Sequence, residues 1–512
     1  MYEADVRLRP GPGARVSPHL FGGLVEHLGR SVYGGVWDPV RDTPRADVLA
    51  AIRALGVSML RWPGGCFSSW YRWQDGVGDR AARPRHERTL WTDLAAVMGP
   101  AFASEMGPPE TNAFGTGEFL RYCADVPCEP LLVANLGGGN PPGSGTPEDA
   151  AAWVRHCNVE RRTALPVRWW AVGNETWGAH EPGHCSASEY ATRFGRFAEA
   201  MRREDPGVRL VACGVCPDQY GLGRDGPWAD WNTTVLRTAG DAIDALSLHW
   251  YFPGMIGRPL RDDDTDYLQV ATGADDLERI LVEVTAEVDA AAPGHRPALA
   301  LDEWGQMAAM EDHLAANHRL ADAVFFAGCY NAMLRHASRL SMAMIAGLVN
   351  VLAPIQTEGD RHFTTAAYLV GLLYRHHTRS RSVPTDVECP RLEVPAMAEL
   401  GAALLAPTSA RTARSSPALD VSATTDATGT TVFLANRSGD QPALVTVHGL
   451  DTGSDELLWR AVTGPHRFAR NDVDHPDVLG FASHAVTARR DRVRVEIPPA
   501  TAGALVTGPR WP

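Results

Sequence analysis

Short apolar runs alternate with longer amphipathic stretches from the N-terminal region to about residue 345. Runs of this kind, rich in Val, Ile and Leu, are typical of parallel strands buried on both faces, and the stretches between them are typical of crossover helices. Strands are predicted at 20–25, 57–61, 130–135, 167–173, 208–213, 243–249, 297–301 and 339–345. Helices are predicted at 46–55, 147–157, 187–204, 275–291 and 320–336. This alternation favours a (β/α)8 TIM barrel, and a doubly wound open sheet is the alternative.

After about residue 376 the pattern changes to alternation of single apolar and polar residues. Examples are VSATTDATGTTVFLANRS, QPALVTVHGL and RVRVEIPPATAGALVTG. Such runs, separated by turn residues, predict the short antiparallel strands of a β-sandwich. The N-terminal segment VRLRP is strand-like too, and we expect it to join this sheet. The fold class is therefore α/β, a barrel followed by a C-terminal antiparallel β-sandwich.

Composition narrows the possible functions. The chain has 512 residues and a formal net charge of −13, so nucleic acid and anionic membranes are not expected partners. All 48 residues counted as Lys or Arg are arginine, which excludes a lysine Schiff base, lysine-anchored pyridoxal phosphate and a P-loop. Nine cysteines are too few for a disulfide scaffold and favour a reducing compartment. Without an apolar leader or a long apolar segment, a cytoplasmic protein is expected.

One motif resembles a zinc site. His180, Glu181 and His184 spell H-E-x-x-H, which on a helix would place two histidines on one face. Pro182 and Gly183 lie inside the motif, and proline costs about 3 kcal/mol in a helix interior. We therefore expect no metal here, and a zinc hydrolase is kept only as an alternative.

Three further patterns have ordinary structural explanations. The G-x-G-x-x-G match at 221–226 has no strand running into it, so a loop is expected. Cys213 and Cys216 form a single C-x-x-C without a second pair, which favours two thiols at the barrel rim over a metal or redox site. The acidic run at 261–266 lacks the glycine and final glutamate of a calcium loop, so a solvated loop is expected.

Two carboxylates follow predicted strands. In VRWWAVGNETWG the apolar run ends at Gly173, so Asn174 and Glu175 fall in the next loop, and in RPALALDEWG Glu303 lies just past a strand end. Active sites of such barrels lie at the C-terminal ends of the strands, so the two glutamates should face each other across one mouth.

Glycoside hydrolysis is the chemistry that best fits two opposed carboxylates. One carboxyl group must donate a proton to the leaving oxygen, while the other must be ionised to attack the anomeric carbon. Trp177 and Trp304 flank the two glutamates and are expected to offer apolar faces to a sugar ring. A catalytically silent sugar-binding barrel is the alternative from a different class.

The chain resembles the α-L-arabinofuranosidases of glycoside hydrolase family 51. The likeness is carried by FGGLVEHLGRSVYGGVWDP, VSMLRWPGGCFSSWYRWQDGVG, WWAVGNETWG, LSLHWYF, LDEWG and GLVNVLAPIQTE, which follow the family's order. The resemblance implies a catalytic barrel over residues 16–375 and a C-terminal β-sandwich over 376–512, joined by the N-terminal strand at 1–15. It also implies a homo-oligomer, commonly a hexamer, that acts on furanoside-containing oligosaccharides without a cofactor.

Residue roles are implied by the same resemblance. Glu175 would be the acid/base and Glu303 the nucleophile of a retaining exo-acting enzyme that removes terminal α-L-arabinofuranosyl residues. The residues that would bind substrate or orient these carboxylates are Glu26, Arg61, Cys66, Asn174, His249 and Tyr251.

Two positions differ from many relatives. Cys66 stands where Asn is common, with Cys in others, and Gly347 stands where Gln is common. The loss of an amide at Gly347 would enlarge the pocket, so we hypothesise tolerance of a bulkier furanose such as β-D-galactofuranose. A glycosidase of the same mechanism that acts on another sugar, a β-D-galactofuranosidase or a β-D-xylosidase, is the nearest alternative.

Overall fold

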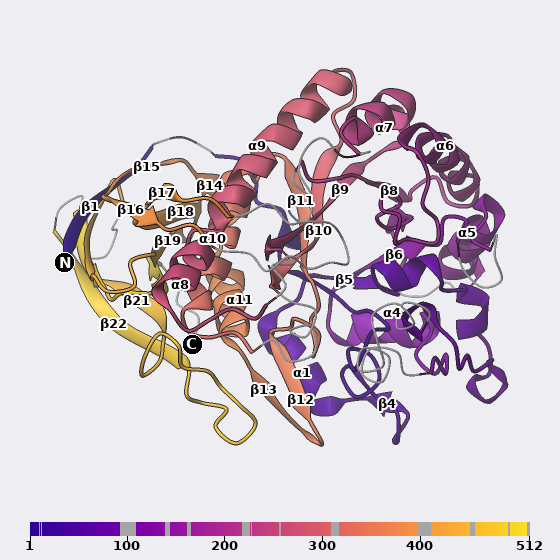
Figure 1. Ribbon diagram of the computed structural model, residues 1–512, viewed down its shortest axis with the longest axis horizontal. Coiled ribbons are helices and arrows are strands. Elements are labelled where there is room, and N and C mark those ends of the chain that lie inside the picture. The colour runs from indigo at the N-terminus through magenta and orange to yellow at the C-terminus, as the bar shows by residue number, and fades with distance from the viewer. Residues whose placement is uncertain are drawn as a thin grey trace.

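Eight parallel strands close into a barrel beside a second, mainly antiparallel sheet (Figure 1). The computed structural model describes residues 1–9, 11, 13–92, 109–138, 144–160, 165–217, 226, 228–254, 258–308, 317–397, 411–450, 456–489 and 492–508. Among the helices of these ranges, none combines the length and apolar character that crossing a lipid bilayer requires.

The barrel strands follow one another in the order β10-β11-β2-β5-β6-β7-β8-β9. Their bounds are β2 Gly22–Leu24, β5 Met59–Trp62, β6 Glu129–Ala134, β7 Trp169–Val172, β8 Arg209–Cys213, β9 Ala245–Pro253, β10 Ala298–Met307 and β11 Leu340–Ile345. Each overlaps a strand predicted from an apolar run. The closed barrel is therefore confirmed, and the doubly wound alternative is wrong.

Helices follow the barrel strands along the chain and surround the barrel (Figure 1). They are α1 Ala46–Leu55, α4 Thr116–Asp125, α5 Pro147–Val154, α6 Ala187–Glu204, α7 Trp231–Ala239, α8 Asp264–Ala271, α9 Ala274–Ala291, α10 Asp322–Arg335 and α11 Ala366–His377. The five predicted helices all occur, whereas α4, α7, α8 and α11 were not expected. In α11 nearly every residue is buried, so its sequence lacks the contrast between apolar and polar faces that indicates a helix.

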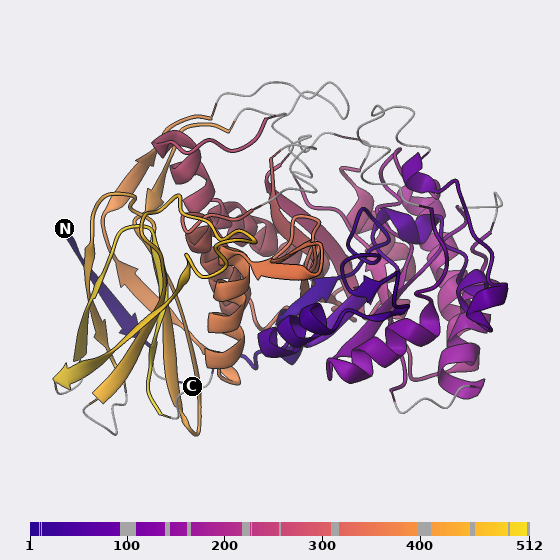
Figure 2. The same cartoon turned by 90° about the horizontal axis from the view of Figure 1, so that it is seen from below.

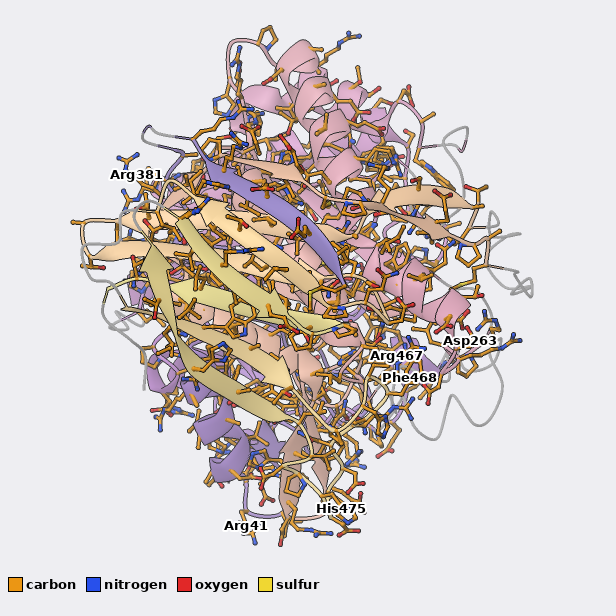
Figure 3. All side chains as sticks on the ribbon, turned by 90° about the vertical axis from the view of Figure 1, so that its left-hand side faces the viewer. Arg41, Asp263, Arg381, Arg467, Phe468 and His475 are labelled. Carbon is orange, nitrogen blue, oxygen red and sulfur yellow. The ribbon has the colours of Figure 1, made fainter. Side chains whose placement is uncertain are left out.

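The second sheet has ten strands in the order β14-β18-β19-β24-β21-β22-β23-β20-β1-β15. Their bounds are β1 Tyr2–Leu8, β14 Arg381–Val383, β15 Thr385–Glu388, β18 Leu419–Asp426, β19 Gly429–Asn436, β20 Ala443–His448, β21 Glu456–Thr463, β22 Gly480–Arg489, β23 Arg492–Ile497 and β24 Thr501–Val506. As expected, the N-terminal strand β1 belongs to it, parallel to β20 and antiparallel to β15 (Figure 3). Packing of this sheet as a sandwich and the three domain boundaries stay predictions.

Three pairs of short strands lie outside the barrel and the ten-stranded sheet. They are β3 Trp37–Asp38 with β4 Thr43–Pro44, β12 Ile355–Glu358 with β13 Arg361–Thr364, and β16 Arg391–Val394 with β17 Arg414–Pro417. All three pairs are antiparallel.

Helices α10 and α11 lie between the barrel and the ten-stranded sheet (Figure 2). Tyr374 of α11 stacks on Phe433 of β19, with 4.1 Å between ring centroids. Asp420 of β18 is buried and pairs with Arg335 of α10 at 2.8 Å and with Arg437 at 3.2 Å. The sheet thus packs against the helices that follow β10 and β11, two of the strands that enclose the barrel.

The acidic run at 261–266 is only in part the solvated loop that was expected, because Arg261, Asp262 and Asp264 are exposed whereas residues 264–266 begin helix α8 and Asp266 is buried. Asp263 accepts a hydrogen bond of 2.9 Å from the backbone N–H of Asp266 and caps the N-terminus of α8. Asp266 is buried and pairs with Arg258. Asp264 pairs with Arg467, which follows β21, and Figure 3 shows Arg467 on the same side of the molecule as Asp263. Two aspartates of the run are thus paired with arginines outside it, and a third caps a helix.

Candidate active site

The C-terminal ends of the barrel strands bring together the eight side chains that the sequence singled out. Glu26 follows β2, Arg61 lies in β5, Cys66 follows β5, Asn174 and Glu175 follow β7, His249 and Tyr251 lie in β9, and Glu303 lies in β10. Convergence of these strand ends on one mouth is the arrangement that active sites of such barrels share.

The turn after β7 positions Glu175. The strand ends at Val172, and Gly173 and Glu175 then adopt left-handed backbone conformations, with φ of 79° and 39°. A left-handed glutamate is strained by roughly 1–3 kcal/mol, and such strain is typical of functional sites. The turn directs the Glu175 carboxylate towards His180 Nε2 and His249 Nδ1, which each lie 2.8 Å from one of its oxygens.

A bulge in β10 positions two acidic residues. Contrary to the prediction, the strand does not end before Glu303 but continues to Met307, and its register with β9 shifts between Ala300 and Glu303. A bulge re-aims side chains, because it disturbs their alternation between the two faces of a sheet. As a result the consecutive residues Asp302 and Glu303 both contact the guanidinium of Arg61.

Arg61 joins three polar side chains in the buried centre of the site. Its Nη1 donates to Glu303 Oε1, its Nη2 donates to Asn174 Oδ1 at 2.7 Å, and its Nε lies 3.3 Å from Asp302 Oδ2. The chain following β5 passes so closely that a Cβ atom on Gly65 would lie 2.5 Å from Glu303 Oε1. Glycine at this position therefore lets the backbone approach the carboxylate.

The two glutamates lie close together. One oxygen of Glu175, one oxygen of Glu303 and a ring nitrogen of His249 all lie within 4.8 Å of one another. His249 Nδ1 is 3.5 Å from Glu303 Oε2, and that oxygen also accepts a hydrogen bond of 2.8 Å from the Tyr251 hydroxyl. Each carboxylate is thus oriented by neutral or cationic donors.

Burial and neighbouring charges shift the protonation of the site. Burial raises the pKa of Glu175, but hydrogen bonds from His180 and His249 outweigh burial and hold that pKa well below its usual range. Burial lowers the pKa of each histidine, but Glu175 and Glu303 outweigh it, and both pKa values rise to about 9. The free site therefore holds its protons on imidazole rings rather than on Glu175.

The pKa of Glu26 is shifted in the opposite direction to that of Glu175. Burial and the negative charge of Glu303 raise its pKa to about 8, although the backbone N–H of Phe67 donates to its Oε1 at 3.0 Å. Glu26 is therefore mainly protonated at neutral pH and can donate a hydrogen bond as well as accept one.

The sequence analysis missed three residues of the site, namely His180, Glu181 and Asp302. His180 and Glu181 were considered only as parts of a zinc motif, but His180 contacts Glu175, and Glu181 accepts a hydrogen bond of 3.0 Å from Asn174. His184 lies elsewhere, with Nδ1 3.1 Å from the carbonyl oxygen of Thr176, so the motif's two histidines share no site. The sequence could have indicated Asp302, because in LDEWG it stands directly before Glu303.

Four side chains of the site have the spacing of a metal centre. Cys66, Glu175, His180 and Glu181 each offer one atom within 4.8 Å of the others. However, the amide nitrogen of Asn174 donates to Glu181 and lies 3.9 Å from the Cys66 sulfur, and an amide NH2 group is a hydrogen-bond donor, not a metal ligand. The group is therefore better described as a hydrogen-bonded network.

Trp304 is fully buried against Phe326 and Tyr330, so the expectation that it faces a sugar ring is wrong. Cys213 and Cys216 are both buried, as ordinary packing thiols are. The glycine motif at 221–226 lies outside the described residues except for its last glycine.

Gly347 follows β11, and a Cβ atom there would lie 2.8 Å from the carbonyl oxygen of Val351. A Gly347→Gln variant would therefore displace the backbone, so it is not a clean test of pocket size. The hypothesis of a wider pocket stays a prediction.

Comparisons with known proteins identify the family of the chain. Residues 51–251 match the family model described as Alpha-L-arabinofuranosidase 1 domain, and residues 302–501 match the Alpha-L-arabinofuranosidase C-terminal domain. An intracellular exo-alpha-(1->5)-L-arabinofuranosidase of Streptomyces lividans is 31% identical over 90% of this chain and 68% of its own length. An intracellular exo-alpha-L-arabinofuranosidase of Bacteroides ovatus is 27% identical over 97% of this chain and 94% of its own.

Solved structures similar to this chain are also α-L-arabinofuranosidases. The crystal structure of an alpha-L-arabinofuranosidase from Thermotoga maritima, in complex with arabinose, superposes with a TM-score of 0.81 at 27% identity, covering 99% of this chain and all of that one. The thermostable GH51 enzyme from Thermotoga petrophila has the same TM-score, identity and coverage.

A closed barrel with two adjacent carboxylates at its mouth and relatives of this kind define the protein as a glycosidase. More closely, the chain belongs to the α-L-arabinofuranosidases of glycoside hydrolase family 51.

Proposed function

We propose that this protein removes non-reducing terminal α-L-arabinofuranosyl residues from oligosaccharides by a retaining double displacement. The observation that supports this mechanism is the approach of Glu175 and Glu303, whose nearest carboxylate oxygens lie within 4.8 Å. Retaining glycosidases have carboxyl groups about 5–5.5 Å apart, whereas inverting enzymes need about 6.5–9.5 Å to admit a water molecule. The separation therefore favours direct attack by one carboxylate.

Glu303 is the proposed nucleophile and Glu175 the proposed acid/base. Arg61 and Tyr251 donate to Glu303, which keeps this carboxylate oriented for attack on the anomeric carbon. As the glycosidic bond breaks, Glu175 gives a proton to the leaving oxygen. It then takes a proton from the water that hydrolyses the glycosyl-enzyme. No cofactor is needed, because carboxylates fill both roles.

The remaining residues of the network are proposed to bind the furanose ring. Asn174 is held between Arg61 and Glu181, which orients its amide for a sugar hydroxyl. Glu26 and Cys66 line the same buried region and can contact other hydroxyls. The Streptomyces lividans relative is named as an exo-(1->5) enzyme, so short arabinofuranosyl-containing oligosaccharides are the substrates that we propose.

Release of nitrophenol from 4-nitrophenyl α-L-arabinofuranoside tests this proposal, with the β-D-galactofuranoside and β-D-xyloside assayed beside it. We expect turnover of the arabinoside, an α-configured first product by NMR, and loss of activity in Glu303→Ala. Faster turnover of the galactofuranoside or the xyloside would leave the proposed mechanism standing but would change the proposed substrate. Absence of any turnover would favour the silent sugar-binding barrel.

We further propose that the protein acts inside the cell as a homo-oligomer, without nucleic-acid or membrane partners. The printed names of the two relatives include the word intracellular. Light scattering coupled to size-exclusion chromatography tests the predicted hexamer, and a monomeric mass would contradict it.

A further inference from the structure

His180 Nε2 and His249 Nδ1 each lie 2.8 Å from one oxygen of the proposed acid Glu175 and hold its pKa well below the usual range, so its ionised form predominates in the free site. Its two oxygens accept hydrogen bonds from His180 and His249, and its side chain is only 3% exposed. A carboxylate in this state has no proton to donate and no direct path to bulk water. Another group must therefore supply the proton when the glycosidic bond breaks.

His180 and His249 differ in their access to water. The His249 side chain is 5% exposed, and its ring nitrogens lie within 3.7 Å of carboxylate oxygens of Glu175, Glu303 and Asp302, which retain its proton. The His180 side chain is 27% exposed, and its Nε2 lies 2.8 Å from Glu175 Oε2. His180 is therefore the group that connects the buried carboxylate with solvent.

We propose that His180 stores the proton that Glu175 delivers to the leaving group and exchanges that proton with solvent. This inference rests on the proposed function, because it assigns the proton source of the same reaction. His180 is a positioning and proton-storing residue, since it acts on the substrate through Glu175.

The surroundings of His180 suit this role. Glu181 Oε1 lies 3.8 Å from His180 Nε2, and Cys66 belongs to the same cluster of side chains. The negative charge of Glu303 also raises the pKa of His180, from a longer distance. The edge of Trp177 packs against the ring, with 5.8 Å between centroids. Gly178 lies so close to the imidazole that a Cβ atom there would collide with it. The ring is thus held in place while its exposed side can meet water.

The proton transfers balance over one catalytic cycle. In the first step the proton moves from His180 Nε2 to Glu175 Oε2 and from Glu175 to the leaving oxygen, while the anomeric carbon becomes bonded to Glu303. In the second step the oxygen of water bonds to the anomeric carbon as its bond to Glu303 breaks, and water gives one proton to Glu175, which returns it to His180. If His180 has already recovered a proton from solvent, it first passes that proton back to solvent.

His180→Gln tests the proposal, because glutamine keeps an N–H donor but does not titrate between pH 5 and 10. The measurement is the pH dependence of kcat/KM for methyl α-L-arabinofuranoside, whose leaving group needs a proton, and for the 4-nitrophenyl glycoside, whose leaving group needs little help. For the methyl glycoside we expect the alkaline limb to move down by about one pH unit or more and kcat/KM at pH 8 to fall about tenfold or more. For the nitrophenyl glycoside we expect a change below about threefold.

His184→Gln is the matched control, because His184 lies in the same segment but contacts a backbone carbonyl instead of a carboxylate. It should leave both profiles unchanged. Equal losses on both substrates with an unmoved alkaline limb would show that His180 has only a structural role and would overturn the proposal. If His180→Gln does not fold, His180→Phe, which keeps a ring against Trp177, is measured in its place.

A second measurement does not depend on turnover. The imidazole of His180 is followed by NMR in protein with carbon-13-labelled histidine, and the signal absent from His180→Gln assigns it. We expect His180 to titrate well above an ordinary histidine and its midpoint to fall by about one pH unit or more in Glu175→Gln. If His180 titrates like an ordinary histidine in both the wild type and Glu175→Gln, the proposal that it stores the proton is overturned. If His180 titrates as expected but the protein hydrolyses no glycoside, only the proposed function is overturned.

Discussion

The Tyr251 hydroxyl donates a hydrogen bond of 2.8 Å to Glu303 Oε2, and the two residues lie on neighbouring parallel strands of the barrel. The bond directs one oxygen of Glu303, while Arg61 holds the other. The carboxylate therefore has a defined orientation before any substrate arrives, and the reaction does not have to impose it.

Removal of this hydroxyl should lower activity more than stability. In Tyr251→Phe, loss of a hydrogen bond to a charged group corresponds to about 1.5–3 kcal/mol, so kcat/KM for 4-nitrophenyl α-L-arabinofuranoside should fall about 10- to 100-fold. Tyr368→Phe is the control, because that hydroxyl donates 2.9 Å to the carbonyl oxygen of Ala51, at the outer helices. Comparable kinetic losses in both variants would refute a specific role for Tyr251.

The stability of the protein should depend on pH through Glu26. The pKa of Glu26 is about 8 in the folded protein, against 4.5 for a glutamate exposed to water as in the unfolded chain. Between these two pH values the folded state therefore holds a proton that the unfolded state has lost. The contribution of Glu26 to the free energy of unfolding therefore falls as pH rises through this window, by about 1.4 kcal/mol for each pH unit. Glu26→Gln should gain in melting temperature relative to the wild type between pH 5 and pH 8.

Asp322→Asn is the control with the opposite sign. Burial raises the Asp322 pKa, but Arg319 outweighs burial and the pKa falls to about 2, so the contribution of this ion pair is lost only as pH falls below about 4. Between pH 5 and pH 8 its deficit against the wild type should be constant. A constant difference for Glu26→Gln over the same range would mean that Glu26 is ionised in the folded protein.

The contact between the barrel and the ten-stranded sheet should depend on Asp420. Asp420→Ala leaves the buried guanidinium of Arg437 with one carboxylate fewer, and breaking a buried pair costs about 3–5 kcal/mol. We expect a clear fall in melting temperature by calorimetry. Asp386→Ala, which breaks the exposed pair with Arg9, should leave the melting temperature nearly unchanged. Equal effects of the two substitutions would be inconsistent with the buried interface.

Gly65 should tolerate no side chain. In Gly65→Ala the new Cβ atom would lie 2.5 Å from Glu303 Oε1, so the carboxylate must move and kcat/KM should fall about 100-fold or more. Gly195→Ala in α6 is the matched control, because a Cβ atom there meets nothing within 4 Å and alanine favours a helix. This control should melt slightly higher and keep full activity. Wild-type activity in Gly65→Ala would show that the Glu303 carboxylate can shift without effect.

Local patterns in the sequence were sufficient for the barrel and for its two glutamates. Each apolar run predicted a strand because a strand buried on both faces needs apolar residues at successive positions, and the structure contains all eight. Glu175 and Glu303 stood out because polar residues directly follow such runs. Helix α11 escaped prediction since it is buried on all sides, between the barrel and the ten-stranded sheet, and such burial removes the periodic contrast.

The sequence by itself therefore determined the strands, their order along the chain and the family to which the chain belongs. Tertiary structure decided which side chains meet. The left-handed turn at Glu175 brings His180 and His249 to one carboxylate, and the register shift in β10 turns both Asp302 and Glu303 towards Arg61. These contacts join residues up to 242 positions apart, so they depend on barrel closure and backbone geometry, which no local pattern of residues contains.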